Sequence, residues 1–290
     1  MIKRIKKISL LVLVLALFIP QYVFASSYSY NTSDSVTISE RDMILELQSL
    51  SDSELLLEGY SQEEITQLRS ISDQSILKEA RMQSDTELKA RGLTDYQIFT
   101  IRNEKNIKKA ASAAYGNVTY TVEKSRYVYN SSKKITELSI IATWNWSSMP
   151  SFRFKDIIAC TTSNKAFSKD SASGKVFYKL GTAGNTLASS SLSVKTQDSG
   201  STTYATFNTE KSYTDTTHPR PTKIFAYSGN LKTTFTAPGK INTVGISSKY
   251  GHSIVSLSTS IGVSSSSFGI SFTPTSKVKS GEEAYVKLYL

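Results

Sequence analysis

Residues 135–146 read ITELSIIATWNW, and this stretch decides the fold of the C-terminal part of the chain. Apolar side chains recur at every second position, and they are Leu138, Ile140, Ala142, Trp144 and Trp146. Alternation with period two is typical of a half-buried β-strand. We therefore assign Trp144 and Trp146 to a core face in preference to an exposed platform that stacks on sugars.

Further short alternating stretches fill residues 116–290, among them NVTYTV, GKVFYKL, TTYATFN, TKIFAYS and AYVKLYL. Turn sequences such as TAPGK separate some of them. No helices alternate with these strands, as the crossovers of a parallel sheet would require. The sequence predicts an all-β antiparallel sandwich or barrel for residues 116–290.

A duplication precedes these strands. Residues 51–69 read SDSELLLEGYSQEEITQLR, and residues 84–102 read SDTELKARGLTDYQIFTIR, an ungapped repeat at a spacing of 33. Each copy contains two capping boxes, in which a hydroxyl residue stands three positions before Glu or Gln. The second boxes begin at Ser61 and Thr94, whereas Gly59 and Gly92 stand where a left-handed residue ends the first helices. Each copy is a predicted helix–Gly turn–helix unit.

The charge of the chain changes at residues 108–117, KKAASAAYGN. Residues 26–115 hold 10 basic and 15 acidic side chains, and residues 116–290 hold 20 basic and 9 acidic ones. The predicted fold is therefore α+β in separate parts: an acidic helical region at 26–115 and a basic β-sandwich domain at 116–290. The opposite charges predict contact between the two, with 26–115 as a candidate pro-segment and 108–117 as a linker or processing site.

The first 25 residues have the features of a secretory signal peptide. A basic start, MIKRIKK, is followed by the apolar run ISLLVLVLALFI, and small residues end at Ala25. We expect cleavage after Ala25 and a secreted, extracellular protein. Cys160 is the only cysteine, which excludes an intrachain disulfide, and its place in the run DIIAC predicts a buried, inert thiol.

The sequence offers few candidates for catalysis. His218 lies in a proline-containing loop and His252 at a predicted strand entry, and neither has partners at the spacing of a metal site. Composition alone would permit a triad of His252, a serine, and Asp156 or Asp215. We regard both histidines as structural or solvated, expect no metal or cofactor, and regard an enzyme as the less favoured class.

The basic excess of the β-domain favours an anionic partner, namely a cell-wall polymer, an anionic lipid surface or nucleic acid, although no specific nucleic-acid motif occurs. An ordinary solvated surface explains the scattered lysines equally well. The first hypothesis is a secreted binding protein of the cell envelope. The alternative is a β-pore-forming toxin masked by its acidic segment, because the Ser/Thr-rich stretches 186–210 and 253–273 read as hairpins with arms long enough to span a bilayer. An ordinary sandwich with a hydroxylated, wet outer face is the favoured interpretation of those stretches, because a lipid-facing set would contain only small residues and few aromatics. An extracellular hydrolase is the second alternative.

The chain resembles uncharacterised secreted proteins of Gram-positive bacteria in three features. These are the leader, the two helical units that share Gly, then Tyr or Leu, then Ser or Thr at their turns, and the terminal strands from YGHS to SFTP. The resemblance brings no known site residues with it.

Overall fold

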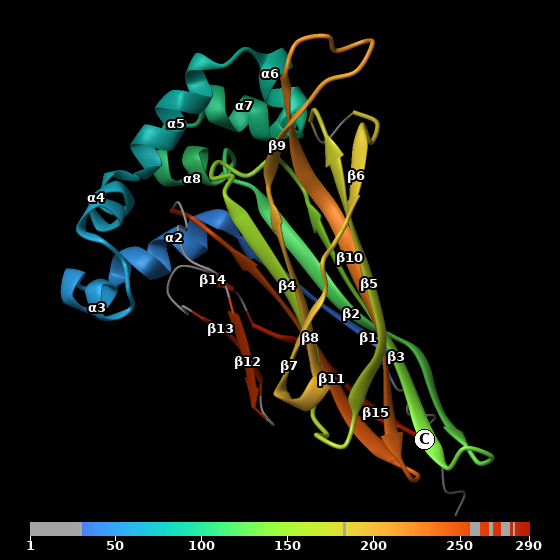
Figure 1. Cartoon of the computed structure of the whole chain (residues 1–290). Coiled ribbons are helices and arrows are strands. Elements are labelled where there is room, and N and C mark those ends of the chain that lie inside the picture. Colours follow the sequence, from blue (N-terminus) through green and yellow to red (C-terminus); the bar gives the residue numbers. More distant parts are fainter. Residues whose placement is uncertain (1–30, 182–183, 256–261, 267–268, 274–278, 281) are drawn as a thin grey trace, which may run out of the picture. The chain divides into compact units, whose positions relative to one another are not determined.

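The computed structural model describes residues 31–181, 184–255, 262–266, 269–273, 279–280 and 282–290. The predicted signal peptide lies outside these described residues. Within Asn31–Leu290, seven α-helices and two larger antiparallel sheets form one unit (Figure 1). The α+β prediction is confirmed, because the helices lie in the N-terminal part of the described chain and the strands mostly follow them.

The first sheet has seven strands, and all its pairs are antiparallel. Its order is β1 (Ser33–Ser39), β2 (Asn117–Asn130), β3 (Ile135–Trp146), β10 (Thr222–Pro238), β5 (Ser168–Lys179) and β6 (Ala188–Ser191), with β9 (Glu210–Tyr213) also on β10. The opening stretch of the sequence is β3, and the residues predicted for its apolar face are all buried.

The second sheet has six strands, in the order β14 (Lys279–Ser280), β11 (Thr243–His252), β4 (Lys155–Thr162), β8 (Thr202–Asn208) and β7 (Lys195–Gln197), with β15 (Ala284–Tyr289) also on β11. A separate hairpin pairs β12 (Gly262–Ser266) with β13 (Gly269–Thr273). The two larger sheets are not closed on themselves, so the predicted sandwich, rather than the barrel, describes them.

The core between the sheets is built on aromatic rings. Trp144 of β3 stacks on Phe207 of β8, with ring centroids 4.7 Å apart, and lies 6.0 Å from the ring of Tyr250 on β11. Gly229 of β10 leaves room for this indole, since a Cβ atom there would stand 2.2 Å from the Trp144 ring. Trp144, the rings of Phe207 and Tyr250 that pack around it, and Gly229 thus set how closely the two sheets approach each other.

The helices are α2 (Glu40–Ser49), α3 (Asp52–Leu57), α4 (Gln62–Ser70), α5 (Asp73–Met82), α6 (Asp85–Ala90), α7 (Asp95–Asn103) and α8 (Ile107–Ser112), and the short 3₁₀ turn η1 (Asp198–Gly200) precedes β8. No helix in the described part of the chain has the length and apolar character needed to cross a bilayer. The repeat is longer than predicted. The spacing of 33 residues also relates α2 to α5, so the duplicated unit has three helices, α2–α3–α4 and α5–α6–α7.

The predicted caps are present in both units. Capping boxes form at Ser51, Ser61, Ser84 and Thr94. Gly59 and Gly92 have φ of 87° and 92°, in the left-handed region. The amides that follow these glycines bond back to the first helices, from Tyr60 to Leu55 O at 3.0 Å and from Leu93 to Leu88 O at 3.1 Å.

An arginine closes each unit in the same way. Arg69 binds Asp52 and donates from Nη1 to Gln48 O at 2.6 Å, at the end of α2. Arg102 binds Asp85 and donates from Nη1 to Arg81 O at 2.7 Å, at the end of α5. Because the last carbonyls of a helix have no partner inside it, a guanidinium at this place completes the first helix of each unit.

Two features of residues 31–117 differ from the prediction of a helical region followed by a linker. The segment includes strand β1, which pairs with β2 from Ser33 opposite Glu123 to Ser39 opposite Asn117. The stretch at 108–117 includes most of α8, and Ala110, Ala111, Ala114 and Tyr115 are buried. Burial of these small side chains against the helices makes the stretch part of the fold instead of an open linker.

The two Ser/Thr-rich stretches also have different structures. Residues 186–210 form only a short hairpin, β7–β8 in the second sheet, because β6 pairs instead with β5 in the first sheet. This stretch crosses from one sheet to the other. The described part of 253–273 does contain a hairpin, β12–β13.

We predict that Gly229→Ala lowers the free energy of unfolding by about 2 kcal/mol, because a methyl group must enter space held by the Trp144 ring and a well-packed core resists overpacking. Urea unfolding, monitored by tryptophan fluorescence, measures the free energy of unfolding of wild type and variant. Gly184→Ala is the control, since a Cβ atom there has no neighbour nearer than 3.9 Å. Equal stability of the two variants would contradict this description of the core.

Candidate functional site

The histidine at the end of β11 is paired with an aspartate of the neighbouring strand. His252 Nδ1 lies 2.8 Å from Asp156 Oδ1 on β4, and both side chains are fully buried. The position predicted as a strand entry is instead the last residue of β11. Strand pairing places the two residues directly opposite each other, so the sheet register creates the contact.

A second carboxylate reaches the same imidazole from the helical region. Glu40 is the first residue of α2, and its Oε1 lies 3.5 Å from His252 Nε2. The carboxylate also accepts hydrogen bonds from the amides of Ser151 at 2.9 Å and Phe152 at 2.8 Å. The imidazole of His252 therefore lies between two carboxylates, one from the helices and one from the second sheet.

Aromatic groups complete the surroundings of this cluster. Tyr250 donates its hydroxyl proton to Asp156 Oδ2, and Trp146 Nε1 donates to the Tyr250 hydroxyl at 3.1 Å. The Trp146 ring meets the imidazole edge-on, with ring centroids 5.0 Å apart. Trp144 and Trp146 are both buried, so neither forms an exposed platform for a sugar.

Charge decides the protonation of His252. Burial by itself lowers the pKa of this imidazole, but the adjoining Asp156 and Glu40 carboxylates outweigh burial and raise the pKa to about 10. His252 is thus an imidazolium at neutral pH. We call Glu40, His252 and Asp156 the buried ion triad.

The buried ion triad lacks the geometry of a catalytic one. In a serine hydrolase the second imidazole nitrogen faces a nucleophilic hydroxyl, whereas here Nε2 faces the Glu40 carboxylate. Ser253 does not act as nucleophile either, because its hydroxyl donates to Lys155 O. All three members are fully enclosed, which denies a substrate access to them. The arrangement joins α2 to the second sheet.

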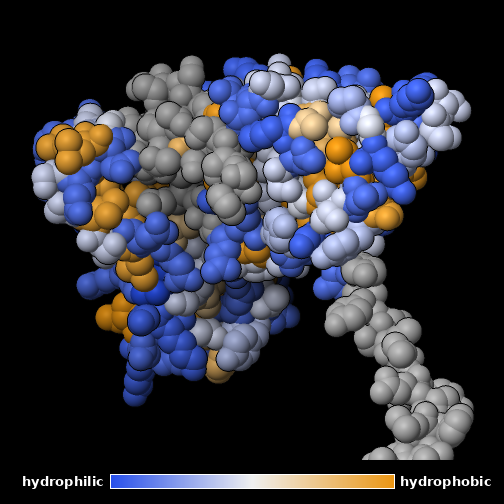
Figure 2. Space-filling view, turned by 90° about the horizontal axis from the view of Figure 1, so that it is seen from below, coloured by the Kyte–Doolittle hydropathy of each residue, from blue (hydrophilic) through white to orange (hydrophobic). Residues whose placement is uncertain are grey.

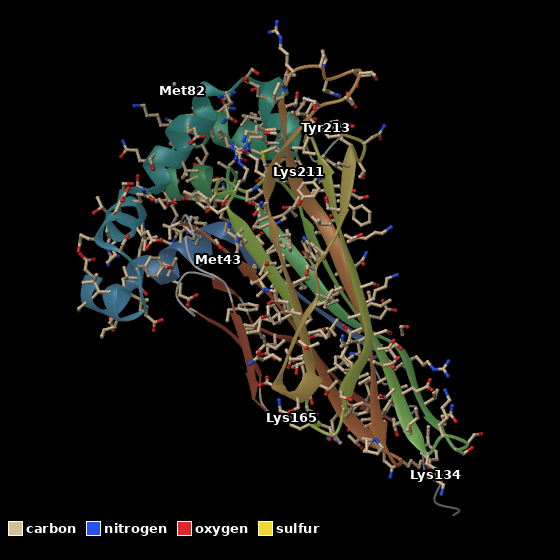
Figure 3. All side chains as sticks on the ribbon, viewed as in Figure 1. Met43, Met82, Lys134, Lys165, Lys211 and Tyr213 are labelled. Carbon is tan, nitrogen blue, oxygen red and sulfur yellow. The ribbon has the colours of Figure 1, made fainter. Side chains whose placement is uncertain are left out.

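His218 lies in a surface turn with the second aspartate of the sequence analysis. Asp215 Oδ1 stands 3.0 Å from His218 Nδ1 and accepts the His218 amide at 2.6 Å. Tyr213 on β9 (Figure 3) donates to Asp215 Oδ2 at 2.8 Å, and hydrogen bonds from Tyr213 and then Thr217 lower the pKa of this carboxyl. These contacts order the turn after β9, and among the described residues no cluster suited to a metal ion occurs.

Cys160 is enclosed between the sheets. Its Sγ lies 3.1 Å from Thr203 Oγ1 and 3.7 Å from Thr233 Oγ1. Burial raises the pKa of the thiol to about 11, even though the two hydroxyls act in the other direction. The thiol is protonated at neutral pH and shielded, as its sequence context predicts.

The solvent face of the first sheet carries a row of polar side chains across its full width, which only the strand pairing reveals. One cross-strand row of neighbours consists of Ser35, Thr121, Thr143, Asn230, Lys175 and Ser191. Adjacent rows add Ser139 and Thr234, whose hydroxyls lie 3.0 Å apart. We call this surface the hydroxyl face.

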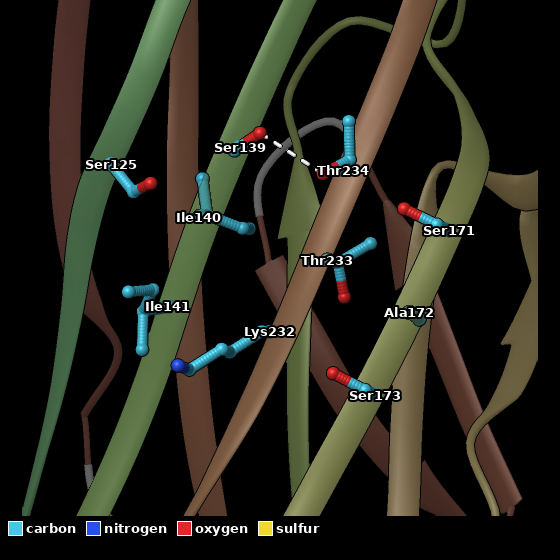
Figure 4. Close-up of a pocket in the computed structure, with 10 residues that line it drawn as sticks. All are labelled: Ser125, Ser139, Ile140, Ile141, Ser171, Ala172, Ser173, Lys232, Thr233 and Thr234. Atoms are coloured by element: carbon cyan, nitrogen blue, oxygen red, sulfur yellow. Dashed lines mark hydrogen bonds between the residues drawn. The ribbon is translucent and has the colours of Figure 1, made fainter.

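The hydroxyl face is hollowed along β2, β3, β10 and β5. One depression of about 330 Å³ is lined by Ser125, Ser139, Ser171, Ser173, Lys232 and Thr234, and Ile141 also lines it (Figure 4). A second depression of about 500 Å³ continues it toward β6 and shares Ser173 and Lys232. Lys175 also lines the second one. Across the described ranges, neither of these lysines takes part in an ion pair, which leaves both charges available to a ligand.

Apolar side chains on the surface are dispersed. The most exposed large ones lie on the helices, and they are Leu57, Met82, Tyr96 and Phe99. Figure 2 shows small separate apolar patches between hydrophilic areas on one face. The hydroxyl face is therefore the more extended candidate surface.

No protein-family model matches this chain, and no curated protein matches it either. Among solved structures, a pore forming protein is 10% identical in sequence to this chain. The match covers 47% of this chain and 74% of that protein, with a TM-score of 0.28. The delta-toxin of Clostridium perfringens shares 11% identity over 60% and 82%, with a TM-score of 0.25. The collagen-binding domain of a Staphylococcus aureus adhesin is 6% identical, and the match covers 53% of this chain and 88% of that domain, with a TM-score of 0.28. Likeness this low carries no argument about function.

We predict that stability falls as pH rises above neutrality. The pKa of His252 is about 10 in the folded chain and about 6.5 when exposed, so the stabilisation is complete below pH 6.5 and is lost as pH rises toward 10. Over that window the free energy of unfolding decreases by about 1.4 kcal/mol per pH unit from this group. Thermal unfolding of wild type and of His252→Gln at several pH values measures the difference. The His218→Gln control keeps the wild-type slope, and a His252→Gln variant with that same slope would refute the assignment.

We expect Glu40→Ala to lower the free energy of unfolding by about 3 kcal/mol, because it removes the carboxylate that faces a buried imidazolium and accepts from two backbone amides. Asp42→Ala, two residues along on the exposed side of α2, is the matched control and costs less than about 1 kcal/mol. Differential scanning calorimetry compares the two. Limited proteolysis of α2–α8 gives an independent measurement, and equal protection in both variants would contradict a linking role for Glu40.

Proposed function

We propose that this protein is an exported, non-catalytic binding protein that attaches to an anionic polysaccharide of a cell envelope through the hydroxyl face. The observation that carries the proposal is the continuous depression lined by hydroxyl groups and by Lys232 and Lys175. The leader-like sequence at residues 1–25 supports export.

The chemistry of the hydroxyl face suits a polysaccharide chain. Serine and threonine hydroxyls both donate and accept hydrogen bonds, as sugar hydroxyls do, and Asn230 adds an amide with the same capacity. A long shallow depression accepts an extended polymer better than a small compact ligand, which needs a deeper enclosure. The surface thus offers many weak contacts along a line.

Charge supports an anionic form of that polymer. Residues 116–290 carry 20 basic and 9 acidic side chains, and two of the lysines line the depressions. Lys179 beside this region lies over the Tyr227 ring, with Nζ 3.9 Å from the centroid, which fixes a further positive charge near β5 and β10. Phosphate or carboxylate groups along a wall polymer would be attracted to this side of the sheet.

We expect the Lys175→Gln/Lys232→Gln double variant to bind purified cell walls about tenfold more weakly at low salt, because each lost contact between a partly exposed lysine and an anion contributes roughly 0.5–1 kcal/mol. Co-sedimentation of the protein with walls measures the affinity. The control is Lys133→Gln/Lys240→Gln, which removes the same charge from two exposed loop positions away from the depressions.

If the hydroxyl face is the binding site, wild type and the Lys133→Gln/Lys240→Gln control bind cell walls with the same affinity. Equal weakening in both double variants would show a general charge effect and refute the assignment of the depression. Walls stripped of their anionic polymers provide the second arm, and undiminished binding to them would refute the anionic ligand.

A further inference from the structure

A small depression lies where the helices α5 and α6 meet the loop between β3 and β4, and we call it the junction pocket. It has a volume of about 250 Å³ and shares no lining residue with the depressions of the hydroxyl face. The Met149 amide donates to Arg91 O at 2.7 Å, so the backbone joins its two walls. The lining includes Glu79, Gln83 and Arg91 on the helical side and Met149, Pro150 and Arg153 in the loop.

The side chain of Arg91 binds only neutral groups. Its Nη1 donates to Gln83 Oε1 at 3.1 Å, and its Nη2 donates to Ala114 O at 3.4 Å. Among the described residues, which include every Asp and Glu of the chain, no carboxylate forms an ion pair with Arg91. This partly buried guanidinium therefore keeps N–H groups for a further acceptor in the junction pocket.

A second guanidinium makes the loop side of the junction pocket positive. Arg153 Nη1 lies 2.9 Å from Glu210 Oε2, but Lys223 Nζ lies 3.0 Å from the other oxygen of the same carboxylate. One carboxylate thus serves two cations. Burial lowers the pKa of Arg91 and the charge of Arg153 acts in the same direction, while carboxylates beyond ion-pair distance act the other way. An anion beside Arg91 would relieve both the burial and the repulsion.

The duplication shows that the helical fold does not require this arginine. The spacing of 33 residues places Glu58 at the position of Arg91 and Leu50 at that of Gln83. In both units the residue at the end of the short helix forms its cap through the backbone amide, which donates to a carbonyl four positions earlier. Capping accounts for the backbone of Arg91 and leaves its side chain to another role.

We propose that the junction pocket binds a small zwitterion of the amino-acid class, whose carboxylate pairs with Arg91 and whose ammonium group pairs with Glu79. This site goes beyond the binding of a polysaccharide and is independent of it. A guanidinium matches a carboxylate in both charge and geometry, because two parallel N–H groups meet two oxygens.

The rest of the lining favours a zwitterion over a doubly charged anion. Glu79 and Glu87 are exposed acidic members of the lining, and like charge at the entrance disfavours a phosphate group. Within the described part of the chain the Glu79 carboxylate takes part in no ion pair, so it is available to an ammonium group. A volume of about 250 Å³ suits a ligand of few non-hydrogen atoms.

NMR of protein labelled with ¹³C at its methionine methyl groups tests the proposal. Met149 lines the junction pocket, whereas Met43 is buried in the core and Met82 is 79% exposed (Figure 3). We expect L-alanine, in roughly the millimolar range, to shift the Met149 signal and to leave the other two in place. At equal ionic strength acetate binds about fivefold more weakly, because it lacks the ammonium group that pairs with Glu79, and phosphate binds more weakly still.

Three variants separate the two contacts. Arg91→Gln weakens both L-alanine and acetate by more than about tenfold, because each loses a charge-assisted pair of hydrogen bonds. Glu79→Gln weakens L-alanine about fivefold and does not weaken acetate, a difference that a merely structural role would not produce. The control Lys78→Gln removes an exposed charge of α5 outside the lining and changes neither affinity.

Two results would overturn the proposal on the wild-type protein alone, whatever the stability of the variants. An unchanged Met149 signal with all three ligands, or equal shifts of Met43 and Met82, would refute the site. Equal affinity for L-alanine and acetate, or a preference for phosphate, would refute the zwitterion. Cell-wall binding by the hydroxyl face does not depend on either result.

Discussion

The buried ion triad is the contact on which the arrangement of this chain depends. Glu40 comes from the first turn of α2, Asp156 from β4 and His252 from the end of β11. Through Tyr250 and Trp146 the same network extends to β3 in the first sheet. Charges buried in this way add little stability over apolar packing, but each is costly without its partners. The triad consequently selects one placement of α2 against both sheets.

The acidic helical part is held to the basic sandwich by backbone as well as by charge. β1 adds a strand to the first sheet, the Glu40 amide donates to Gly116 O at 3.0 Å, and the Met149 amide donates to Arg91 O at 2.7 Å. The net charges of the two regions predicted contact, and contact is present. The hydrogen bonds named above fix where the two regions meet. The opposite net charges of the two regions only attract them to each other without selecting a position.

Local patterns in the sequence predicted local structure well. The capping boxes at Ser61 and Thr94, the glycine turns at Gly59 and Gly92, and the alternation of β3 each depend on residues a few positions apart, and each is present. The pairing of Glu40 with His252 joins residues more than 200 positions apart, and nothing near either residue indicates it. β1 was missed because its polar composition hides a strand that is stabilised by its partner.

Strand β1 changes what a cut in the helical segment would accomplish. Its ladder with β2 runs along all seven residues, and the helices that follow it are anchored at Glu40 and around Tyr115. A protease that severed any one connection between helices would produce two polypeptides that migrate as a single particle under native conditions. Separation would need the β1 ladder to open, a slow and cooperative event. In this architecture the backbone nick and the departure of the helices are two distinct steps with their own rates.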